Sequence, residues 1–104
     1  MATGIVLQLA STGTVRKAAF GSFTITFTGA VSRITTLVTH NLGVVPSCVL
    51  AMANRPTGQV SLVCDEDTAA GAPTTTQVNI SAITFNNTNP VNGTVYTVYW
   101  LALG

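Results

Sequence analysis

Gly93-Thr-Val-Tyr-Thr-Val-Tyr-Trp-Leu-Ala-Leu103 is the stretch of this chain that decides its fold. Successive side chains of a strand point to opposite sides, and here the residues on both sides are apolar. One side would hold Val95, Tyr99, Leu101 and Leu103, and the other Tyr96, Val98, Trp100 and Ala102. A strand with one wet face alternates apolar with polar residues, so we expect a central strand covered on both sides.

Seven more β-rich runs precede this stretch, separated by Gly, Pro, Asn and Ser at a spacing typical of all-β domains. They are residues 5–10, 14–20, 22–28, 31–39, 45–53, 59–64 and 75–85. The pattern predicts an antiparallel β-sandwich or jelly-roll of about eight strands. Residues 1–21 would form an N-terminal arm with edge strands, and residues 22–104 the sandwich of a single domain.

Two connections look like hairpin turns. Gly29-Ala30 predicts a two-residue turn between neighbouring strands, and Asn54-Arg-Pro-Thr-Gly58 predicts a five-residue hairpin loop. Pairing symmetrically about Pro56 would place Met52 opposite Val60, Leu50 opposite Leu62 and Cys48 opposite Cys64. We expect the two thiols to be reduced and buried, with a disulfide as the alternative.

Run 22–28 alternates cleanly, and its Phe23, Ile25 and Phe27 are predicted to face the core. In run 75–85 the alternation slips near Ser81-Ala82, which favours a bulge.

Charged residues make up only 7% of the chain, where about 25% is usual, and the net charge is +1. No stripe of basic residues is present to neutralise phosphates, so we do not expect the protein to bind nucleic acid. No apolar run is long enough to span a membrane, and the first residues lack a signal peptide pattern, so we expect synthesis in a cytoplasm. So few charges favour association with other subunits, and we expect a homo-oligomer.

Candidate sites for chemistry are few. His40 has no nucleophile elbow, metal-ligand spacing or paired carboxylates beside it. We therefore predict a loop histidine that bonds to the backbone, and we expect no catalytic residue, no cofactor and no enzyme.

Asp65-Glu66-Asp67 could attract Ca²⁺, but consecutive acids lack the alternate spacing of a ligating loop, and a solvated loop is favoured. Tyr96, Tyr99 and Trp100 could stack on a sugar, but their strand places them in the core. The residues predicted to contact a partner are Arg16, Lys17, Arg55, Asp65, Glu66 and Asp67.

Two motifs carry a resemblance: Thr39-His-Asn-Leu-Gly-Val-Val-Pro-Ser-Cys-Val-Leu50 and the closing Val98-Tyr-Trp-Leu-Ala-Leu-Gly104. A "His-x-Leu-Gly-x-x-Pro" turn followed by a "Trp-x-Ala" strand is similar to small β-sandwich domains of bacteriophage virion proteins. The closing strand also resembles the H-type lectin sandwich, which is commonly trimeric. The resemblance spans roughly residues 22–104 and implies a non-enzymatic structural protein at the virion surface.

Within that resemblance the shortness of the chain favours a capsid decoration protein, a trimer that binds the major capsid protein or another virion protein. Residues 1–20 would then pair with a neighbour by strand addition. The alternative is a receptor- or glycan-binding module of a tail fibre or tail tip, with its site on loops 65–73 or 86–92.

Overall fold

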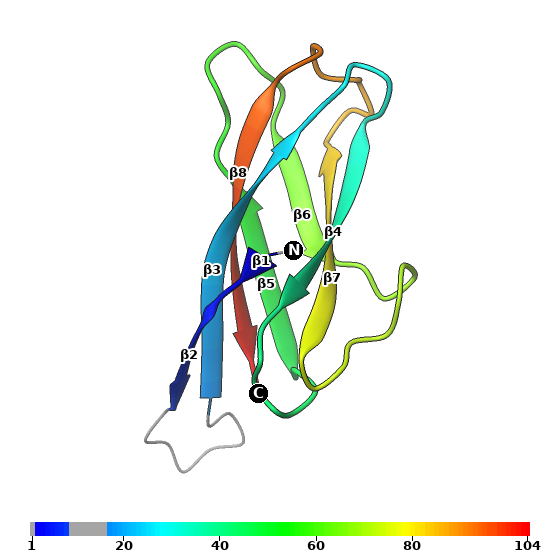
Figure 1. The fold of residues 1–104 in the computed structure, drawn as a ribbon. Helices are drawn as coiled ribbons and strands as arrows, with labels where there is room; N and C mark the ends of the chain where they lie inside the picture. The colour runs from blue at the N-terminus through cyan, green and yellow to red at the C-terminus, as the bar shows by residue number, and fades with distance from the viewer. Residues whose placement is uncertain (1, 9–16) are drawn as a thin grey trace.

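A computed structural model describes residues 2–8 and 17–104 of the chain, and for residues 2, 3, 7 and 8 the backbone alone (Figure 1). These residues form eight strands and no helix. The strands are β1 (Ala2–Thr3), β2 (Ile5–Gln8), β3 (Lys17–Thr26), β4 (Arg33–Thr39), β5 (Cys48–Ala53), β6 (Leu62–Glu66), β7 (Gln77–Thr84) and β8 (Val95–Leu103). No described helix is long and apolar enough to cross a membrane.

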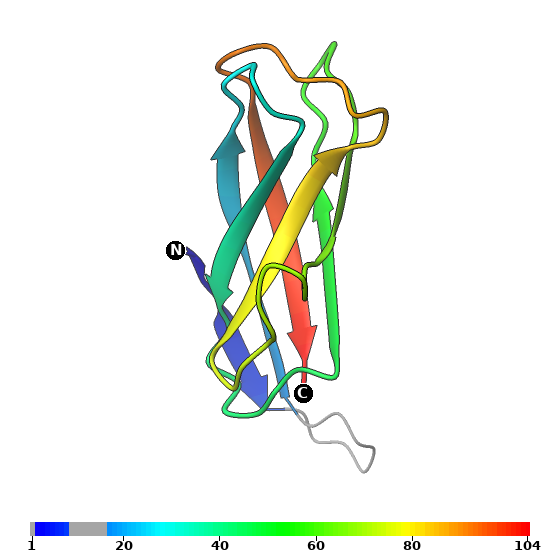
Figure 2. The same cartoon turned by 90° about the vertical axis from the view of Figure 1, so that its right-hand side faces the viewer.

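The strands form two four-stranded sheets that lie face to face (Figure 2). One sheet has the order β1-β4-β7-β6 and the other the order β2-β3-β8-β5. All neighbours are antiparallel except β1 and β4, which run parallel. The predicted all-β sandwich is therefore confirmed.

Strand β8 is central in its sheet, as its composition predicted, and pairs with β3 and β5 along its length. Its residues Tyr96, Val98, Trp100 and Ala102 are buried between the sheets. The buried or half-buried side chains of Phe23 and Ile25 from β3, and of Phe27 just after it, pack on the same core, also as predicted. The ring of Phe27 meets that of Tyr96 edge to face, with centroids 5.5 Å apart.

The N-terminal residues pass from one sheet to the other at Gly4. The Gly4 amide donates to the Thr39 carbonyl of β4 at 3.2 Å, and Ile5 then pairs with Phe20 of β3. A side chain at Gly4 would overlap the Trp100 indole ring and the Phe20 carbonyl oxygen. The prediction that this segment reaches out to a neighbouring subunit is wrong for the described residues 2–8, because they pair with strands of their own chain.

Two predicted strands merge in the structure. Residues 14–20 and 22–28 were expected to be separate, but β3 runs unbroken through Gly21. A Cβ at Gly21 would lie 3.2 Å from the Trp100 ring, so glycine leaves room for the indole instead of ending the strand. The predicted bulge at Ser81-Ala82 is also wrong, since β7 keeps one register with β4 and with β6.

Both predicted hairpins are crossovers between sheets. Strand β3 leads to β4 in the other sheet, and β5 leads to β6 in the other sheet, so Leu50 pairs with Leu101 and not with Leu62. The Gly29 and Gly58 backbones do turn with positive φ, as expected at these positions. Such turns reverse the chain equally well within one sheet or from one sheet to the next.

Candidate interaction surface

The outer side of sheet β2-β3-β8-β5 is an exposed apolar face. Antiparallel pairing aligns its side chains in rows: Ile5, Phe20, Leu101 and Leu50 form one, and Ser22, Tyr99 and Met52 form the next. Leu50, Met52 and Tyr99 are 56%, 69% and 53% exposed. The prediction that β8 is covered on both sides is therefore wrong for this chain alone, because only its inner face meets the second sheet.

Where β8 and the edge strand β5 meet on this surface, the structure has a shallow pocket of about 310 Å³. Its lining residues are Leu50, Ala51, Met52, Tyr99, Trp100 and Leu101. We call the exposed residues Leu50, Met52 and Tyr99, together with the half-buried Leu101, the apolar patch. Of the three aromatic residues predicted to be core, Tyr96 and Trp100 are buried, but Tyr99 belongs to this patch.

The side of β5 that carries Cys48, whose thiol was predicted to be buried, faces solvent and not the core. The small side chains of Val49, Ala51 and Ala53 pack on the core, whereas the larger Leu50 and Met52 point to solvent. Cys48, on the same outward side as Leu50, is exposed. None of the outward residues of β5 or β8 carries a charge.

The outer side of the other sheet is, by contrast, partly covered by the chain itself, along β7, while outward residues of β4 and β6 such as Leu37 and Val63 stay exposed. After β6, residues 67–76 cross the outside of β7, as seen in Figure 2. The Asp67 amide donates to the Asn79 carbonyl at 2.8 Å and fixes the start of this segment. The two outer faces therefore differ: one is crossed by this covering segment at β7, and the other carries an open apolar patch.

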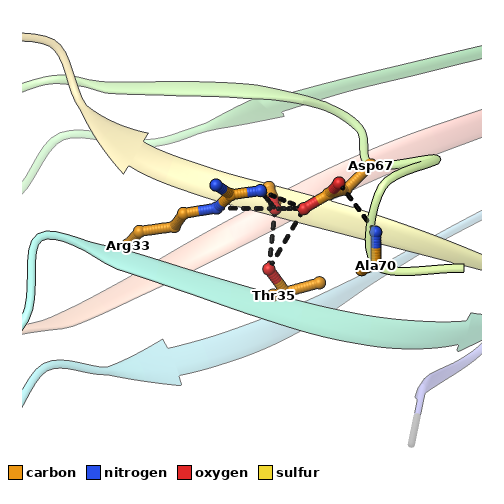
Figure 3. A network of polar contacts seen from close by, with 5 residues as sticks. Arg33, Thr35, Asp67 and Ala70 are labelled. Carbon is orange, nitrogen blue, oxygen red and sulfur yellow. Dashed lines mark hydrogen bonds and ion pairs between the residues drawn. The ribbon is translucent and has the colours of Figure 1, made fainter.

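A polar network holds that cover in place (Figure 3). Asp67 is buried and forms an ion pair with Arg33 of β4. The Ser81 hydroxyl donates to Oδ2 of Asp67 at 2.5 Å, and the Ala70 amide donates to Oδ1 at 3.1 Å. The Thr35 and Ser81 hydroxyl oxygens lie 2.7 Å apart and complete the network.

These contacts favour the ionised carboxylate. The hydrogen bond from Ser81 is the largest cause that lowers the pKa of Asp67 to about 2, with smaller contributions from the Ala70 amide and Arg33. Desolvation by burial acts in the opposite direction and does not outweigh them. The expectation of a solvated acidic loop is therefore wrong for Asp67, because a cation and two donors compensate its burial.

We expect the stability of the protein to fall as the pH is lowered from about 4 to about 2, because the unfolded chain then binds a proton at residue 67 that the folded chain does not. Urea unfolding midpoints measured across this range should decline more steeply for the native protein than for Asp67→Asn. The control Asp65→Asn removes an exposed carboxylate of β6 outside this network and shows how the loss of another nearby acid alters the curve. Parallel curves for the native protein and Asp67→Asn would contradict this assignment.

The other residues predicted to contact a partner are scattered. Lys17 is half-buried and its Nζ donates to the Leu42 carbonyl at 3.3 Å, and Arg55 is exposed in the loop between β5 and β6. Asp65 is exposed and Glu66 half-buried at the end of β6, while Arg16 lies outside the described residues. The structure brings none of the four described charges onto the apolar patch, and the role of all these residues toward a partner stays a prediction.

His40 is fully buried and bonds to the backbone, which confirms the prediction for it. Its Nδ1 accepts the Leu42 amide at 3.0 Å, so the ring proton sits on Nε2, which donates to the Thr74 carbonyl at 3.1 Å. Both ring nitrogens are thereby used to join the turn after β4 to the covering segment.

The two thiols are free, as expected, but they do not face each other across a hairpin. Cys48 is exposed on β5, so the expectation that both are buried is wrong for it. Burial, followed by the neighbouring Asp65, raises the pKa of the half-buried Cys64 thiol. Within the described part of the chain, no three His, Cys, Asp or Glu residues are grouped so as to hold a metal ion.

The apolar pattern of the closing strand is a sequence signal for the apolar patch as well as for a buried strand. Apolar residues on both faces of residues 93–103 were attributed to a buried strand, although an exposed face awaiting a partner gives the same pattern. Of the two loops suggested as alternatives for receptor binding, 86–92 lies at one end of the sandwich, whereas 65–73 projects beside its middle (Figure 1).

No protein-family model and no curated protein matches this chain. Among solved structures, the chain is similar to the tailspike protein gp49 from Pseudomonas phage LKA1, with a TM-score of 0.65 and 17% sequence identity. The similarity covers 83% of this chain but only 14% of the tailspike chain. At this identity the likeness shows only that this chain and the matched part of the tailspike share a fold.

Proposed function

We propose that this protein is a non-enzymatic structural component of a bacteriophage particle, located at the tail, and that the apolar patch attaches it to another virion subunit. The observation that carries the proposal is the uncharged, exposed sheet face around Leu50, Met52 and Tyr99. Contiguous apolar surface of this kind marks interaction sites in proteins. The sandwich shared with part of a phage tailspike supports the location at the tail.

The mechanism would be thermodynamic. A protein that binds only the assembled particle stabilises the assembled state by mass action, as any ligand stabilises the state that it prefers. The small number of charges, 7% of the residues, suits a component that functions in contact with other subunits.

Because the patch is uncharged, we expect attachment to depend only weakly on salt. Raising NaCl to about 1 M, where charges are screened beyond about 3 Å, should leave the protein on its particle. Pelleting of particles at low and high salt, followed by quantification of the bound protein, measures this. Release at high salt would show that the scattered charges, such as Arg55 and Asp65, provide the attachment instead.

A second candidate is a capsid decoration protein, in which the same patch would bind between subunits of the head. The face that it needs is equally uncharged and exposed, and a trimer predicted from the sequence would present three copies of it. The two candidates differ in their binding partner and not in the surface used.

The experiment that separates them is cosedimentation of the purified protein with tails, with empty heads and with host cells, each supplied alone. Binding to tails supports the proposal, whereas binding to heads and not tails overturns the tail location in favour of decoration. Binding to cells alone would indicate a receptor-binding module. The double variant L50K/Y99K should lose binding to virion parts, and V63K, on the other sheet, should keep it.

A further inference from the structure

Strand β5 is an edge strand whose outer backbone groups have no partner among the described residues. In the β3–β8 ladder the bonded pairs include Lys17 with Gly104, so the even residues of β8 bond to β3. Its odd residues therefore bond to β5, in agreement with the bond from the Asn54 amide to the Thr97 carbonyl. The amides and carbonyls of the even residues of β5 are therefore bonded to β8. Those of Val49, Ala51 and Ala53 point in the opposite direction, outward from the free edge of the sheet.

This edge lacks the features that usually prevent pairing with another chain. Natural edge strands are shortened, bulged, or given lysine or proline residues, because unpaired amides and carbonyls recruit other strands. Strand β5 runs six residues, Cys48-Val-Leu-Ala-Met-Ala53, without a charge or a proline. The edge of the other sheet on the same side, β6, carries Asp65 and Glu66.

We propose that β5 pairs antiparallel with β5 of a second copy about a two-fold axis at Ala51. This register is self-complementary: Ala51 faces the partner's Ala51, and Val49 faces the partner's Ala53. All three residues direct their amides and carbonyls outward, so each facing pair exchanges two hydrogen bonds. The two sheets then become one continuous sheet across the axis.

The same register joins the apolar patches of the two copies. Leu50 and Met52 lie on the outward side of β5, and about the axis Leu50 of one copy stands opposite the partner's Met52. No charge opposes a charge at these positions. A β6–β6 pairing would instead bring the acids Asp65 and Glu66 of one copy toward those of the other, which disfavours that alternative. A second copy of this chain can therefore pair with β5 without bringing like charges together.

The inference does not depend on the location of the protein on a particle, and native mass measurement of the purified protein tests it. The expected mass is that of a dimer, or of a hexamer if three-fold contacts are also present; a monomer or a trimer across the micromolar range overturns it. The variant L50K/M52K places like charges opposite one another at both symmetric contacts and should weaken the dimer about 10- to 100-fold.

A charge-complementary variant tests the register itself. In L50E/M52K each introduced acid stands opposite an introduced base of the second copy, so this variant should dimerise at least tenfold more tightly than L50K/M52K. Variant V63K adds a lysine at a half-exposed valine of β6 and should dimerise like the native protein. Equal dimerisation of the two double variants, each shown to be folded by circular dichroism, would overturn the pairing of Leu50 with Met52.

Discussion

Replacing Trp100 with alanine lowers the free energy of unfolding by about 3–5 kcal/mol, the largest effect that we expect from any single substitution. The indole is 3% exposed and packs in a cluster with Val38 and Ile80 from the facing sheet and with Leu42 from the turn after β4. Its removal leaves a cavity that the paired strands around it cannot close. Domains of this size are stable by only about 5–15 kcal/mol, so the variant should be close to unfolding at room temperature.

The measurement is urea unfolding followed by far-ultraviolet circular dichroism, since the substitution removes the only tryptophan. Tyr99→Ala is the matched control, because it removes the adjacent aromatic side chain from the exposed face of the same strand. We expect that control to cost less than about 1 kcal/mol. Equal losses would mean that the outer face is already covered in the purified protein.

Gly4→Ala should cost about 1–3 kcal/mol, the second largest effect. The added methyl group meets the Trp100 ring and the Phe20 carbonyl oxygen, and the carbonyl belongs to the backbone of a paired strand that cannot yield. Either β3 shifts, or the segment holding β1 and β2 leaves the sandwich and uncovers the indole. Both outcomes reduce stability through the same contact.

Gly58→Ala is the control for this prediction. A Cβ at Gly58 meets nothing within 4 Å, so its cost is that of a left-handed alanine alone, about 1 kcal/mol. Urea unfolding compares the two variants, and hydrogen exchange at the Ile5 and Val6 amides reports whether β2 has detached. A smaller loss for Gly4→Ala than for Gly58→Ala would refute the docking of the N-terminal segment over Trp100.

The fold class was predictable because strand alternation is a local property. Phe23, Ile25 and Phe27 face the core as their spacing indicated, and β8 is central as its two apolar faces indicated. The pairing of strands was less predictable. The symmetric apolar pattern on either side of Pro56 arises equally when two strands pair and when they lie in opposite sheets across a core.

The candidate site could be predicted only in part. Apolar side chains on both faces of a strand show that both faces avoid water, but not whether the cover is the same chain or another one. Leu50 and Met52 share a side of β5 with Cys48, whose thiol was predicted to be buried, but that side is exposed. The partners of Asp67, Arg33 and Ser81, lie 34 and 14 residues away in the sequence. No local pattern indicates such contacts, so Asp67 was predicted to be solvated.

The connectivity of the sandwich has a consequence for the order of events in folding. From β3 onward, the link between β6 and β7 is the one that joins strands paired in the same sheet; the other links cross between sheets. Chains dominated by such non-local pairing fold slowly, because much backbone must be ordered before contacts compensate it. Strand β8 pairs with both β3 and β5, and it is the last of the described strands in sequence, so these pairings form only once β8 is available. On a ribosome, this sandwich should therefore gain stable structure only after residues 95–103 have emerged from the exit tunnel.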